Sequence, residues 1–138
     1  MKGTENMKSL QPAHWQRPKG YANGVVASGR TVFVSGMIGS DTQGNVVSGD
    51  FVKQARQALE NIVEVLAEAG AKAEHIVRMN WYLVDKNEYL DAHKQLGVAY
   101  REIIGRHYPA MTAVQVASLV EEAARLEIEV TAVIPDTQ

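Results

Sequence analysis

The chain has 138 residues, of which 46% are hydrophobic and 22% charged, and its formal net charge is −2. This length and composition are typical of one globular domain and exclude a largely disordered chain. The slightly acidic charge argues against a nucleic-acid partner, and the absence of cysteine excludes disulfides, thiolate metal ligands and a cysteine nucleophile.

The N-terminal third of the sequence predicts short strands between loops. Residues 1–9 are polar and patternless, and we expect residues 1–12 to be flexible. Strands are expected at 22–27 and at 31–35, the second of which is rich in β-branched residues. The four glycines within 36–49 indicate a loop.

Two helices are expected in the middle of the chain. Apolar residues recur there at steps of three and four, which is the helical period. The first helix is expected to begin after Asp50 as its N-cap and to run to Ala69, with Gly70 as its stop. The second is expected to begin at Asn87 and to end near Ile104.

Three further strands are expected, at 76–84, 111–118 and 126–134. The last strand alternates between an apolar face and a face that carries Glu127 and Glu129. This pattern predicts an α+β fold in which both helices cover one face of a mixed sheet. The opposite face is partly apolar, as a subunit interface would be.

No apolar run resembles a signal peptide within residues 1–20, and no stretch approaches the roughly 20 apolar residues of a membrane-spanning helix. We therefore expect a cytoplasmic protein without a membrane partner.

Several segments resemble the RidA (YjgF) family of enamine and imine deaminases, in order and in spacing. The strongest is the Tyr-Pro-Ala-Met segment at 108–111, followed by alternating apolar residues and by the Glu-Ile-Glu strand at 127–129. Other matching segments lie at 20–21, 33–36 and 54–61. The similarity covers about residues 18–134.

The resemblance implies a single RidA-like domain over residues 1–138 with a chorismate-mutase-like fold. It also implies a homotrimer with a central β-barrel and three pockets at the subunit interfaces. Members of the family hydrolyse a small-molecule enamine or imine to a carbonyl compound and ammonia, without a metal or an organic cofactor. Some members have been linked to RNA cleavage, an activity that the acidic charge disfavours here.

The resemblance assigns pocket roles to Tyr21, Gly36 and Glu127. Tyr21 matches a pocket tyrosine, and Gly36 matches a glycine whose backbone lines the pocket. Glu127 matches the glutamate that positions the attacking water, a role that requires partial burial. The alternatives are an aromatic lid for Tyr21 and an interface ion pair for Glu127.

Three polar positions of the family pocket differ in this chain. Met111 replaces the arginine that grips the substrate carboxylate, and cannot make its charged, bidentate contact. Ala113 stands where some members have cysteine. His93 stands where many members have asparagine, and is either an acid–base group or a core histidine. These departures predict a ligand different from a simple 2-imino acid.

Two readings follow from these departures. The first is a hydrolytic deaminase for a larger enamine, imine or amino-substituted unsaturated acid, of which an aminomuconate-type compound is one candidate. In this interpretation Arg17 or Lys19 replaces the missing arginine. The second is a non-catalytic trimer that binds a small metabolite or a partner protein. Plain surface charge is the alternative role of Arg17.

Overall fold

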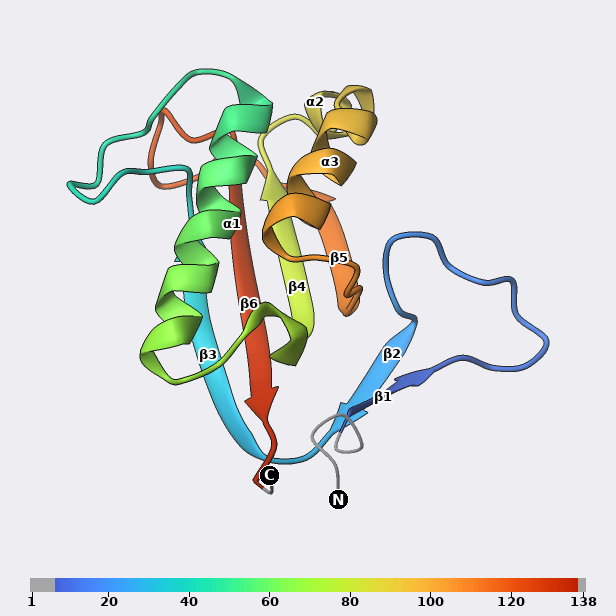
Figure 1. Cartoon of the computed structure of the whole chain (residues 1–138). Coiled ribbons are helices and arrows are strands. Elements are labelled where there is room, and N and C mark those ends of the chain that lie inside the picture. The colour runs from blue at the N-terminus through green and yellow to red at the C-terminus, as the bar shows by residue number, and fades with distance from the viewer. Residues whose placement is uncertain (1–6, 137–138) are drawn as a thin grey trace.

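A mixed four-stranded sheet forms the centre of the molecule (Figure 1). The structure is a computed structural model that describes residues 7–136. The strand order is β3-β6-β4-β5, and β4 and β5 are parallel while the other pairs are antiparallel. The bounds of the strands are β3 Arg30–Met37, β4 Ile76–Leu83, β5 Ala110–Gln115 and β6 Leu126–Ile134.

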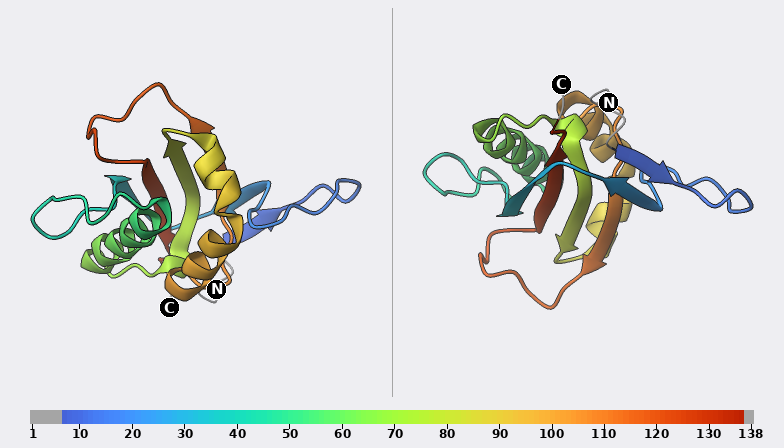
Figure 2. Two further views of the ribbon diagram at one scale, coloured as in Figure 1. Left: turned by 90° about the horizontal axis from the view of Figure 1, so that it is seen from above. Right: turned by 90° about the horizontal axis from the view of Figure 1, so that it is seen from below.

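The helices lie on one face of this sheet, as expected (Figures 1 and 2). They are α1 Phe51–Glu68, α2 Lys86–Asp91 and α3 His93–Ile103, and a 3-10 turn, η2 Ala73–His75, leads into β4. The Asp50 carboxylate caps α1 by accepting a hydrogen bond from the Lys53 N–H at 2.9 Å. Within residues 7–136, no helix combines the length and the apolarity needed to cross a membrane.

The alternation in β6 decides which face of the sheet is core. Leu126, Ile128 and Ala132 are fully buried under α1, and Val130 is 1% exposed. Glu127 and Glu129 lie on the opposite face, which no helix covers. Phe33 on β3 is a large apolar side chain on that face and is 79% exposed.

The expected second helix is two helices. Asp85 rather than Asn87 is the N-cap, because its carboxylate accepts from the Asn87 N–H at 2.9 Å and so starts the helix at Lys86. Ala92 then has φ −92° and ψ 12°, outside the helical region, which ends α2 before α3 begins at His93.

The N-terminal segment also differs from expectation. Met7–Leu10, expected to be flexible, form β1, which pairs antiparallel with β2 Gly24–Ala27. Residues 1–6 lie outside the described residues. The loop between β1 and β2 projects from the body of the molecule (Figure 1). Ala22, expected within the strand, makes only an isolated bridge to Ala110.

Candidate active site

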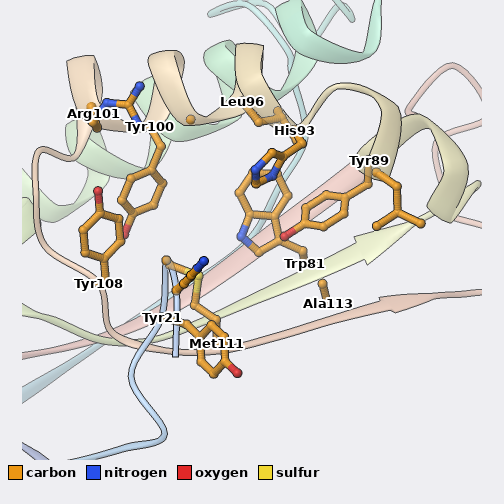
Figure 3. Close-up of a pocket in the computed structure, with 14 residues that line it drawn as sticks. Tyr21, Trp81, Tyr89, His93, Leu96, Tyr100, Arg101, Tyr108, Met111 and Ala113 are labelled. Carbon is orange, nitrogen blue, oxygen red and sulfur yellow. The ribbon is translucent and has the colours of Figure 1, made fainter. Parts of the chain in front are cut away.

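A hollow of about 610 Å³ lies between the β4–β5 side of the sheet and the helices α2 and α3 (Figure 3). Its lining comes from residues 19–21, from both strands, from both helices and from Tyr108. The volume is within the range of small-molecule sites, and much of the lining is aromatic or aliphatic, as in such sites.

Two aromatic pairs form the walls of the hollow. Trp81 and Tyr89 meet edge to face with centroids 5.6 Å apart, and Tyr100 stacks on Tyr108 at 5.5 Å. The Tyr100 hydroxyl donates to the His107 carbonyl oxygen at 2.5 Å. Burial raises the pKa of both Tyr89 and Tyr100, so both phenols stay neutral at physiological pH.

Five residues singled out in the sequence meet in this hollow: Lys19, Tyr21, His93, Met111 and Ala113. Met111 and Ala113 both face it because alternate residues of β5 share one side of the strand. His93 is exposed at the start of α3, not buried in the core. Tyr21 is 43% exposed where the projecting loop returns to the sheet.

Glu127 and Gly36 form a second group, outside the lining of the hollow. They lie on the neighbouring strands β6 and β3, and the Glu127 side chain covers the Gly36 backbone so closely that a Cβ at Gly36 would lie 1.9 Å from Oε2. One chain therefore brings the predicted site residues together in two separate groups.

The cations of the hollow are Lys19 and Arg101. Arg17 lies in the projecting loop and does not contribute to the lining. Sequence reasoning missed Arg101, although one signal was present: Gly97 interrupts α3 one turn earlier, and a Cβ there would lie 3.1 Å from Arg101 Nη1.

Glu129 anchors a polar cluster on the open face of the sheet. Its Oε1 accepts from the Tyr82 hydroxyl at 2.5 Å and from Asn80 Nδ2 at 3.1 Å. The hydrogen bond from Tyr82, followed by that from Asn80, lowers the pKa of Glu129. The same bond to Glu129 is the largest of the causes that raise the pKa of Tyr82.

Among residues 7–136, no group of three or more His, Asp or Glu side chains is arranged to hold a metal ion. The chemistry that the two groups of residues offer is therefore that of a carboxylate, phenols, an imidazole and two cations.

Comparisons with known proteins identify relatives of this chain. The model of the family described as Endoribonuclease L-PSP matches residues 14–134. A human protein named 2-iminobutanoate/2-iminopropanoate deaminase is 35% identical over 105 residues, which are 75% of this chain and 73% of that protein. A RutC family protein of Pyrococcus abyssi is 32% identical over 84% of this chain and 88% of its own length.

Solved structures show the same fold. The crystal structure of YyfB from Yersinia pestis, a Rid family protein of unknown function, has a TM-score of 0.78 and 27% identity over 94% of this chain and 99% of that one. The structure of E. coli TdcF with bound serine has a TM-score of 0.67 and 31% identity over 91% of this chain and 98% of that one.

Proposed function

The chain belongs to the RidA/YjgF family, and on this premise we propose that it hydrolyses an enamine, an imine or an amino-substituted unsaturated acid and releases ammonia. Relatives that are 35–36% identical are named as 2-iminobutanoate/2-iminopropanoate deaminases, which supports a deaminase-type function at the level of the family. The observation that carries the proposal is the glutamate held against Gly36, combined with an aromatic hollow that contains Tyr21.

The active site is completed by a second copy of the chain. Tyr21 lines the hollow in one chain, whereas Glu127 lies on the sheet face that the helices leave uncovered. A neighbouring subunit packed on that face would remove from water the Phe33 side chain, which is 79% exposed there. A homotrimer with its sheets turned inward to form a barrel would bring the Glu127 of one copy to the hollow of the next.

In the proposed reaction, the imine lies between Tyr21 and the backbone near Gly36. Glu127 takes a proton from a water molecule as the water oxygen bonds to the C=N carbon. Glu127 delivers that proton to the nitrogen, which gives a carbinolamine. A second proton then moves from the carbinolamine hydroxyl, through Glu127, to the nitrogen as the C–N bond breaks, so that ammonia leaves and the C–O bond becomes a C=O bond. The residues that carry these steps belong to the chain, and no cofactor takes part in them.

The substrate is larger than a four-carbon imino acid. Met111 offers no charge to a carboxylate at the position where the family pattern has arginine. The hollow of about 610 Å³ has room for a longer ligand, and its aromatic walls favour a flat one. An aminomuconate-type acid is one compound of this class.

Ammonia release from enzymatically generated imines and amino-substituted dienoic acids tests the function. We expect wild type to act on a long substrate and poorly on 2-iminobutanoate, and Glu127→Gln to lose about 100-fold or more in kcat. Glu122→Gln, an exposed glutamate five residues away, is the matched control and should be unchanged. Full activity of Glu127→Gln would contradict the mechanism.

Mixed assemblies test the sharing of the site. Subunits with Tyr21→Phe and subunits with Glu127→Gln should regain activity when they are unfolded and refolded together. Some interfaces then join the intact Tyr21 of one subunit to the intact Glu127 of the other. Activity that stays at the level of the separate variants would place the whole site within one chain.

A second candidate is a non-catalytic trimer that binds a metabolite, which the uncharged Met111 favours. Ligand binding in the hollow without ammonia release from any member of the panel would support it.

A further inference from the structure

Arg101 is a cation beside the hollow. It lies on the last turn of α3 and is exposed, and among the described residues it makes no ion pair or hydrogen bond. Arg56 and Arg125, by contrast, pair with Glu102 and Glu88 at 2.7 and 2.8 Å. A guanidinium has five N–H donors in a planar fork, a geometry that suits a carboxylate.

Gly97 lets this guanidinium lie along α3. A Cβ at position 97 would lie 3.1 Å from Arg101 Nη1, closer than ordinary van der Waals contact. Glycine within a helix costs about 1 kcal/mol relative to alanine, so its presence here calls for a reason. The close approach of Arg101, which is labelled in Figure 3, supplies one, and both residues line the hollow.

Trp81 adds a hydrogen-bond donor to the same hollow. The residue is 4% exposed, and its Nε1 is buried without a hydrogen-bond partner among the described residues. An unpaired buried N–H is unfavourable, and an acceptor on a ligand would satisfy it. Tyr21 and Met111 lie on the side of the indole that carries Nε1, and both side chains are partly exposed, so a ligand can displace them (Figure 3).

We propose that the hollow binds a flat, unsaturated carboxylate, with its carboxylate on the Arg101 guanidinium and its other end beside the Trp81 indole N–H, which an acceptor atom at that end would satisfy. Arg101 thus takes the place of the charge that Met111 lacks, from a different element of the fold. The stacked Tyr100 and Tyr108 rings offer a surface for the conjugated part of the ligand. This assignment deepens the proposed function and rests on it.

Binding of sorbate (2,4-hexadienoate) to the full chain tests the ligand class. The chain has two tryptophans, so Trp15→Phe, in the projecting loop, leaves Trp81 as the single indole signal in ¹⁵N-resolved NMR spectra. Sorbate should shift that signal in a saturable way. Hexadienol, which lacks the charge, should bind about tenfold more weakly or worse. Hexanoate, which lacks the flat diene, should also bind more weakly. Equal affinities for the three compounds, or no saturable shift with sorbate, would overturn the assignment.

Substitutions of Arg101 and of two other cations test whether Arg101 binds the carboxylate. Arg101→Gln should weaken sorbate binding about tenfold or more, and Arg101→Lys should retain part of the affinity. Lys94→Gln, which removes an exposed cation of α3 outside the lining, is the matched control and should be neutral. Unchanged affinity in Arg101→Gln, or a larger loss in Lys19→Gln than in Arg101→Gln, would overturn the role of Arg101.

These measurements need no turnover, so their failure is distinct from failure of the proposed reaction. Sorbate binding that depends on Arg101, without ammonia release from any substrate, would support carboxylate binding by Arg101 and contradict the proposed deaminase activity. Ammonia release that depends on Glu127, with an unchanged KM in Arg101→Gln, would support the deaminase activity and contradict carboxylate binding by Arg101.

Discussion

Gly36 and Glu127 are in contact across the β3–β6 pair: a Cβ at Gly36 would lie 1.9 Å from Oε2 and 2.8 Å from Cγ of Glu127. Because Cγ as well as the carboxylate is in the way, a side chain at position 36 would force Glu127 into another rotamer. The glycine therefore determines where the proposed general base lies.

Gly36→Ala is expected to lower ammonia release about tenfold or more, because a general base works only within hydrogen-bond reach of its water. Stability should change little, since the atoms in the way belong to the Glu127 side chain and not to the backbone. Gly49→Ala is the matched control, because no atom lies within 4 Å of its added Cβ. Steady-state kinetics with thermal unfolding of both variants would check this. Unaltered kcat in Gly36→Ala would show that the position of Glu127 is not important.

Periodicity was sufficient to predict most of the fold. The β6 strand has the expected bounds, and its alternate residues are buried as expected, because a period of two on a half-buried sheet is a strong signal. The four residues of β1 show no such alternation, so the sequence offers nothing that distinguishes them from a loop. The break at Ala92 was also invisible, because alanine is a good helix former.

The site was less accessible to sequence reasoning. Residue-by-residue matching singled out Tyr21 and Met111, which do meet in the hollow. It missed Arg101, since a surface arginine on a helix looks like any other charge until the fold shows what lies beside it. The separation of Glu127 from the hollow depends on how the sheet and helices pack, which no motif encodes.

The bond between Tyr82 and Glu129 predicts a pH-dependent stability. Because Tyr82 holds the pKa of Glu129 below its ordinary value, the bond stabilises the fold above the unfolded-state pKa and loses that effect as pH falls through the lowered one. Tyr82→Phe should raise the pKa of Glu129 and cost about 1 kcal/mol at pH 7, which is typical of one hydrogen bond between partly buried side chains. The difference from wild type should vanish in acid.

Urea unfolding between pH 3 and 7, roughly the range in which carboxylates titrate, with NMR titration of the Glu129 carboxyl would measure both effects. An unchanged pKa for Glu129 in Tyr82→Phe would contradict the prediction.

Gln54 is expected to be important for stability. It is fully buried, donates from Nε2 to the carbonyl oxygens of Ser48 and Ala123 at 2.8 and 3.0 Å, and accepts from the Arg125 N–H at 2.7 Å. Gln54→Leu would leave three backbone groups without partners and should cost about 2–4 kcal/mol in free energy of unfolding. The exposed Gln95→Leu is the control, and denaturant unfolding of both variants would show the difference. Equal stabilities would mean that water takes over these bonds.

Gly97→Ala is expected to separate stability from binding. Alanine favours the helix by up to about 1 kcal/mol, and its Cβ meets only the flexible end of Arg101, so the free energy of unfolding should rise. The same Cβ would displace the guanidinium from its place beside the hollow, so the affinity for a carboxylate should fall several-fold. Val98→Ala, on the exposed side of α3, is the control for the binding effect. A more stable variant with undiminished sorbate affinity would mean that Gly97 has no part in positioning Arg101, whereas a more stable variant that binds weakly would explain why a helix-breaking residue is present at this point of α3.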